Sequence, residues 1–184
     1  NKKSCTTGHT GFSLPFISWP DRSDCPRNAA RVLRYMDRMV IVKQGEVFYI
    51  TQALAILEGY ERGPAGNTAL AAAFALAQQM DRDQIIVVNE TEYTSAGKHP
   101  MPQLTFAKNN GVEVLFGNPD EDIPGKNIVL PSDPSVMKAR EYDLMHSKKS
   151  YVRNCVERNN MKKASEEDIQ FICDEIRENR DFVI

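Results

Sequence analysis

Short β-branched runs and amphipathic runs follow one another along the first half of the chain. Residues 39–43 (MVIVK) and 85–89 (IIVVN) are apolar runs of the kind that is typical of buried strands. Residues 46–58 have apolar side chains at helical spacing and are followed by Gly59, which favours a left-handed helix end. A second helix is predicted over residues 68–80. This order of strands and helices predicts an α/β fold in which helices cover parallel strands.

The second half of the chain begins with a further strand signal and then becomes charged and helical. The alternating run at residues 112–116 (VEVLF) predicts a strand at the edge of a sheet. Ser165 and Asp168 form a capping pattern that predicts the start of a helix. We therefore expect residues 1–130 to belong to an α/β domain and residues 131–184 to form a helical tail that packs on another lobe or subunit.

Composition and charge exclude several classes of function. The chain of 184 residues is 41% hydrophobic and 26% charged, which is ordinary for a soluble globular protein. A net charge of −2 and a pI near 6.0 give no bulk attraction to nucleic acid or to an anionic membrane. The four cysteines form no CxxC pair, so neither structural zinc nor a disulfide framework is expected. No apolar run reaches bilayer length, and nothing resembles a signal peptide, so we expect a cytoplasmic protein.

The turn at residues 63–68 (GPAGNT) carries the strongest chemical signal in the chain. Its glycines would let a ligand approach the backbone closely, and the following helix presents its positive end there. Asn67 and Thr68 add side-chain hydrogen-bonding groups. The plainer interpretation is that Asn67 only caps the helix, with no ligand involved. The residues alone leave both interpretations open and slightly favour the cap.

The loop after residue 89 holds a second group of candidate residues. Glu90, Glu92 and Tyr93 could hydrogen-bond a cofactor ring or orient a substrate. Lys98 and His99 could serve as a base or as ligands of an anion. The first three also fit the polar exit of a buried strand, and the last two fit solvated surface.

Three stretches within residues 39–78 resemble a known enzyme family. MVIVKQGE, ALAILEGYERGPAG and TALAAAFALAQ are similar to the C-terminal part of the fold-type II pyridoxal-phosphate enzymes, such as threonine synthase, threonine dehydratase and cysteine synthase. IIVVNETEYTSAGKHP resembles the last strand of those enzymes and the loop that follows it. Over essentially all of its length, the chain looks closest to the C-terminal portion of the larger subunit of a thiolase within this group.

The resemblance implies a fold, a reaction and partners. The fold would be the three-layer parallel sheet of tryptophan synthase β-like enzymes, with residues 1–130 in the catalytic domain. Pyridoxal 5'-phosphate would be the cofactor and coenzyme A a substrate, in the cleavage of 2-amino-4-oxopentanoate to acetyl-CoA and alanine during ornithine fermentation. The partners would be a small α subunit and other copies in a homo- or hetero-oligomer.

The same resemblance implies a cofactor-binding wall and shows where this chain departs from the family. The wall would comprise Ala65, Gly66, Asn67, Thr68 and Glu92. Ala65 stands where the family has a serine facing the pyridine nitrogen, so either Thr68 or Asn67 would replace it or the ring nitrogen has another partner. We expect the Schiff-base lysine and the glycine-rich phosphate loop upstream of these residues. No catalytic residue is therefore expected in this segment, which alone should be inactive.

A different class of function also fits the residues. A non-catalytic α/β domain could bind a small anion or a partner protein through the same turn at residues 63–68.

Overall fold

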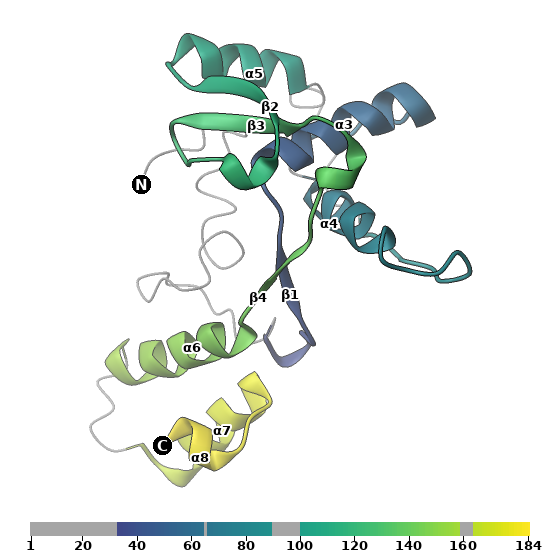
Figure 1. Cartoon of the computed structure of the whole chain (residues 1–184). Coiled ribbons are helices and arrows are strands. Elements are labelled where there is room, and N and C mark those ends of the chain that lie inside the picture. The colour runs from purple at the N-terminus through teal and green to yellow at the C-terminus, as the bar shows by residue number, and fades with distance from the viewer. Residues whose placement is uncertain (1–32, 65, 90–99, 159–163) are drawn as a thin grey trace. The chain divides into compact units, whose positions relative to one another are not determined.

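The computed structural model describes residues 33–64, 66–89, 100–158 and 164–184 (Figure 1). The described residues fall into two compact units, which are treated separately below. The larger unit contains residues 40–140, and the smaller unit contains residues 33–39 and 141–184. The domain boundary that we expect after residue 130 stays a prediction.

A parallel pair of strands lies at the centre of the larger unit. Strand β2 (Glu113–Gly117) pairs with β3 (Asn127–Pro131) in parallel, with Leu115 opposite Val129. Helix α3 (Gln44–Glu58) contacts β3, and helix α5 (Pro100–Asn109) contacts β2 (Figure 1). The expected α/β arrangement of parallel strands with helices packed on them is confirmed for this unit.

Helix α3 packs on the sheet with one face and on helix α4 (Thr68–Ala77) with another. Phe48 is buried in a cluster formed with the strands and α5, whose other members are Leu104, Ala107, Val112, Ile128 and Leu130. Val47 and Ile50 face the other way and pack with Ala71 and Ala75 of α4. These two alanines lie one turn apart on the same helix face, so their small side chains let the backbones of α3 and α4 approach closely.

The first turn of α3 lies directly against the backbone of β3. A Cβ atom added at Gly45 would lie 1.8 Å from the carbonyl oxygen of Val129, which is far inside van der Waals contact. At its other end, α3 stops at Gly59, whose φ of 63° is left-handed as the sequence predicts. Glycine is thus required at Gly45 for space and favoured at Gly59 for backbone conformation.

Two short helical turns connect the parts of the larger unit. The turn η1 (Pro119–Glu121) follows β2, and its N-cap Asn118 accepts a hydrogen bond from the Asp120 N–H at 3.1 Å. The turn η2 (Pro134–Val136) follows β3. Both turns therefore lie beyond the carboxyl ends of the parallel strands.

The prediction of a buried strand is wrong for residues 85–89, and for residues 39–43 the strand is confirmed but its burial is not. Only Met39–Ile41 forms a strand (β1), and Ile41 is 38% exposed. Strand β1 pairs with β4 (Arg140–Tyr142), where the chain passes between the two units, and does not join β2 and β3. Residues 85–89 form neither strand nor helix, and Ile85 and Val87 are exposed. By contrast, the run at 112–116 is a strand of a two-stranded sheet, as expected for an edge.

The smaller unit is helical, as the composition of the last third predicts. It contains α6 (Leu144–Arg158), α7 (Glu166–Ile176) and α8 (Arg180–Val183). Its core is formed by Leu33, Ile172 and Ile176. The predicted cap is confirmed, because the Ser165 hydroxyl accepts from the Asp168 N–H at 3.1 Å and the Asp168 carboxylate accepts from the Ser165 N–H at 3.0 Å. None of the helices in the described ranges combines the length and apolarity that a membrane crossing needs.

Candidate functional site

The turn before α4 is tightly built into the larger unit. The backbone N–H of Asn67 donates to the Gly63 carbonyl at 3.2 Å, and the Asn67 carbonyl accepts from the Ala71 N–H at 2.9 Å. Gly63 and Gly66 are both buried. The turn leads directly into the first residues of α4. The first N–H groups of a helix have no acceptor within it, so this end of α4 carries a partial positive charge.

The Asn67 side chain does not cap α4, although Asn67 occupies the N-cap position. It is fully buried, and its Nδ2 donates to Thr51 Oγ1 of α3 at 3.1 Å. Thr51 in turn donates to the Val47 carbonyl at 2.7 Å. The Oδ1 atom of Asn67 is buried without a hydrogen-bond partner. The interpretation of this side chain as a simple cap is therefore wrong; it ties the turn to α3 and leaves one acceptor unsatisfied.

Thr68, the neighbouring candidate, has the opposite environment. Its side chain is exposed, and its hydroxyl lies 3.5 Å from the Pro64 carbonyl oxygen, at the outer limit of a hydrogen bond. Among the described residues of the unit, the hydroxyl therefore has only this long contact. The structure thus brings Gly66, Asn67 and Thr68 together at one turn, with Asn67 turned inward and Thr68 turned outward.

Ala65 and Glu92 lie outside the described residues, as do Glu90, Tyr93, Lys98 and His99. Their predicted places in the cofactor wall stay predictions.

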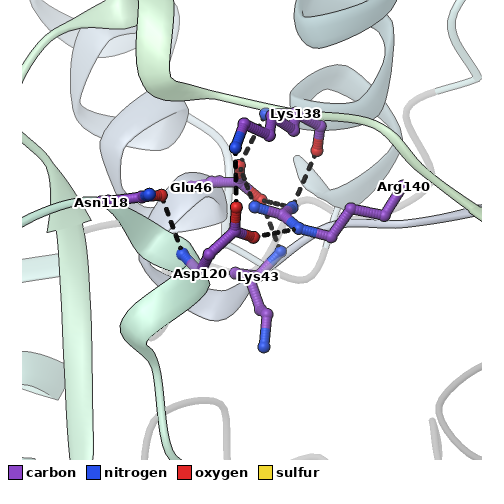
Figure 2. Close-up of polar contacts among 6 residues, drawn as sticks. All are labelled: Lys43, Glu46, Asn118, Asp120, Lys138 and Arg140. Carbon is purple, nitrogen blue, oxygen red and sulfur yellow. Dashed lines mark hydrogen bonds and ion pairs between the residues drawn. The ribbon is translucent and has the colours of Figure 1, made fainter.

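A cluster of charged and polar residues surrounds Glu46 at the start of α3 (Figure 2). The sequence analysis did not predict this cluster. The Glu46 carboxylate is fully buried and accepts from the backbone N–H groups of Lys43 at 2.6 Å and Lys138 at 2.8 Å. It also accepts from Arg140 Nη1 at 2.8 Å. Nearby, Asp120 accepts from Lys138 Nζ at 2.8 Å and from Arg140 Nε at 2.6 Å.

This network holds the larger unit together. Each carboxylate accepts from at least one cationic side chain, and that of Glu46 also accepts from two backbone N–H groups, so the charges compensate one another. The hydrogen bonds from Lys138 and Arg140 lower the pKa of Asp120. The spacing of Lys43 and Glu46 is a local capping signal, but nothing in the sequence pairs Glu46 with Arg140, which is 94 positions away.

Asp122, beside this network, has a less favourable environment. Its Oδ1 atom is buried without a hydrogen-bond partner. Burial raises the pKa of Asp122 above its ordinary value of 3.8, and the negative charge of Glu46 adds to this effect. Lys43 and the backbone of Val129 act in the opposite direction but do not cancel it. The ionised form of Asp122 is therefore destabilising in the folded chain.

The variant Asp122→Asn should be more stable than the natural chain at pH 7. Because the pKa of Asp122 is higher when folded, ionisation costs stability above the unfolded pKa, and this cost disappears as the pH falls below it. The stabilisation should therefore shrink between pH 7 and pH 4 in urea titrations. Asp120→Asn is the matched control. It should lower stability at pH 7, because the pKa of Asp120 is lowered. A destabilising Asp122→Asn at pH 7 would contradict this account.

Known relatives of the chain are long proteins of which it matches one part. It is 60% identical over 183 residues to a protein named 2-amino-4-ketopentanoate thiolase beta subunit from an unknown prokaryotic organism. It is 58% identical over 183 residues to a protein of the same name from Acetoanaerobium sticklandii. The whole of this chain is similar to thiolase beta subunits. It spans 39% of the length of either relative.

The sequence motifs predicted that the chain resembles the C-terminal portion of the larger subunit of a thiolase. The similarity to thiolase beta subunits confirms this resemblance. No protein-family model and no solved structure matches the chain. For the two relatives, the term beta subunit implies a companion subunit.

Proposed function

We propose that this chain forms one wall of a pyridoxal-phosphate site in a thiolase that cleaves 2-amino-4-oxopentanoate with coenzyme A. The products would be acetyl-CoA and alanine. The observation that carries the proposal is the identity of 58% and 60%, over the whole chain, to 2-amino-4-ketopentanoate thiolase beta subunits. The ketopentanoate of that name is the same compound as the oxopentanoate named here.

The turn before α4 fits one side of a pyridoxal ring. Because Gly66 has no side chain, it would not obstruct a ring that approaches the backbone, and the helix end would favour a negatively charged group. Thr68 is an exposed residue beside it, and within the described part of the chain its hydroxyl makes only a long contact with the Pro64 carbonyl oxygen, at 3.5 Å. When bound, the cofactor supplies an electron sink for the carbanion left on the amino-acid fragment.

The chain's own residues have distinct roles in this proposal. Thr68, in the first turn of α4, offers the hydroxyl that holds the pyridine nitrogen in place of the serine replaced by Ala65. Asn67 positions the turn through its hydrogen bond to Thr51. Glu92 contributes to the same wall. The residue that bonds covalently to the cofactor lies in the part of the subunit beyond this segment.

The proposal includes the wider architecture and the assembly. The parallel pair β2 and β3, with α3 and α5 packed on it, would be part of a fold-type II sheet. The complete subunit would act with a small α subunit in a homo- or hetero-oligomer.

Absorbance spectroscopy of the complete beta subunit with added pyridoxal phosphate tests the proposed function. The cofactor bound to a protein lysine should absorb at the edge of the visible range, and borohydride should remove that band. A complete subunit that gives no such band would overturn the proposal. It would favour the alternative of a non-catalytic domain that binds an anion or a protein.

Thr68→Ala should weaken the binding of pyridoxal phosphate to the complete subunit by about tenfold, the loss expected for one hydrogen bond. Equilibrium dialysis of the cofactor measures the change. Thr68→Ser is the control, because it keeps the hydroxyl and should bind nearly as well as the natural subunit. Equal losses in the two variants would show that the hydroxyl does not hold the cofactor.

A further inference from the structure

The outer face of helix α6 carries a positive charge. Both α6 and α7 belong to the smaller unit (Figure 1), and α6 contributes Tyr151 and Cys155 to its core. Lys149 and Arg153 lie on the opposite side of α6, four residues apart, and both are exposed. Among the described residues neither forms an ion pair, even with Glu157 at the margin of the same face. Like charges at this spacing repel each other, so an acidic partner would stabilise the face.

The outer face of helix α7 is acidic and has an exposed aromatic ring at its centre. Phe171 is 58% exposed, with Glu167 four residues before it and Asp174 three residues after it. The Asp174 carboxylate accepts from Gln170 Nε2 at 2.9 Å, and Glu167 forms no ion pair within the described ranges. An exposed aromatic side chain rimmed by charged groups is typical of a protein–protein interface.

The two outer faces match in length and in charge. Residues 149–156 of α6 and 167–174 of α7 each extend over about 10 Å of helix. Each stretch includes an exposed apolar side chain, which is Val156 on α6 and Phe171 on α7. The arginines beside α7 do not neutralise its face, because their charges are offset by ion pairs within the unit: Arg34 with Glu175, Arg177 with Asp37 and Arg180 with Glu166. The smaller unit therefore carries both halves of a complementary contact.

We propose that two copies of the complete beta subunit associate through these faces, with α6 of each copy against α7 of the other. A twofold axis makes the same contact twice, which is how a single chain with two complementary patches forms a closed dimer. In each contact Arg153 would lie over the ring of Phe171, where a guanidinium is attracted to the aromatic face. The proposal names the surface used by the proposed oligomer, and it does not depend on bound pyridoxal phosphate.

Charge reversal followed by mixing tests this contact in the complete beta subunit. One variant combines Lys149→Glu with Arg153→Glu, and the other combines Glu167→Lys with Asp174→Lys. Each variant alone should associate at least about 100-fold more weakly, because like charges then face each other in both contacts. Sedimentation velocity should show half the mass of the natural assembly. An equimolar mixture of the two variants should regain the full mass, because each contact then joins opposite charges.

A control variant separates this contact from a general effect of net charge. Lys108→Glu with Lys126→Glu makes the same change of charge at exposed positions of the larger unit and should leave the mass unchanged. Full mass in both test variants, or no recovery on mixing, would overturn the proposal. A mass loss seen only when the α subunit is present would also overturn it, because the α subunit would then be the partner.

The denaturant midpoint at low protein concentration distinguishes a second copy from another part of the same chain. Each test variant should unfold at the midpoint of the natural subunit when all are monomeric. A lowered midpoint under these conditions would overturn the proposal, because the faces would then pack within one subunit. The absorbance band of the cofactor should persist in both variants, so a failure of this proposal is distinguishable from a failure of the proposed function.

Discussion

Gly45→Ala should lower the free energy of unfolding by about 3 kcal/mol or more, because the new methyl group has no space. The added Cβ would lie 1.8 Å from the Val129 carbonyl oxygen, and both atoms belong to rigid regular elements. Relief would require α3 to move away from β3, which would open the cluster around Phe48. Urea unfolding followed by circular dichroism measures the change.

Gly117→Ala is the matched control for this prediction. Its added Cβ would lie 3.7 Å from Val129 Cγ1, which is an ordinary van der Waals distance to the same residue. We expect this variant to unfold within about 1 kcal/mol of the natural chain. If Gly45→Ala is as stable as Gly117→Ala, then α3 does not lie against β3 as described.

Arg140→Ala should lower the free energy of unfolding by about 2 to 4 kcal/mol, because it removes the cation that compensates a buried carboxylate. Glu46 is fully buried, and Arg140 Nη1 lies 2.8 Å from its Oε2 atom. After the substitution, Glu46 would keep its two backbone donors, from Lys43 and Lys138, but its charge would be unpaired. Chemical unfolding at pH 7 gives the size of the loss.

Lys138→Ala measures the contribution of the neighbouring surface ion pair apart from that of the buried pair. The Lys138 side chain is 54% exposed and pairs with Asp120, so its loss should cost less than about 1 kcal/mol. The backbone N–H of residue 138, which donates to Glu46, is kept in this variant. Equal costs for Arg140→Ala and Lys138→Ala would show that burial of the Glu46 charge is not the dominant effect.

Local signals in the sequence predicted the elements that depend on neighbouring residues. The helix over residues 46–58 and its stop at Gly59 follow from apolar spacing and from the left-handed preference of glycine. The cap formed by Ser165 and Asp168 follows from a spacing of three residues. Each of these features is decided within one or two turns of chain, so a single sequence contains the necessary information.

Features that depend on distant parts of the chain could not be predicted in the same way. The runs at 39–43 and 85–89 have the composition of buried strands, but burial also requires neighbouring strands, and composition does not show where those lie. Likewise, the pairing of Glu46 with Arg140 is a tertiary contact without a sequence signal.

A helix start at the turn of residues 63–68 could be predicted from the sequence, but the orientations of Asn67 and Thr68 could not. The role of this turn in binding a cofactor stays a prediction. The opposite orientations of these two residues depend on Thr51, which is 16 positions away on another helix. An asparagine before a helix commonly caps it, so only the tertiary contact reveals that this one does not.

The close contacts of α3 have a consequence for engineering the proposed site. Gly45 sets the separation of α3 from the sheet, and Ala71 sets the separation of α4 from α3. The location of Thr68 therefore depends on two small residues that would never touch a ligand. We expect that a larger residue such as Val in place of Ala71 would displace the start of α4, and with it the proposed site. A library aimed at the binding properties of this turn should vary these spacer positions as well as the residues exposed at the turn.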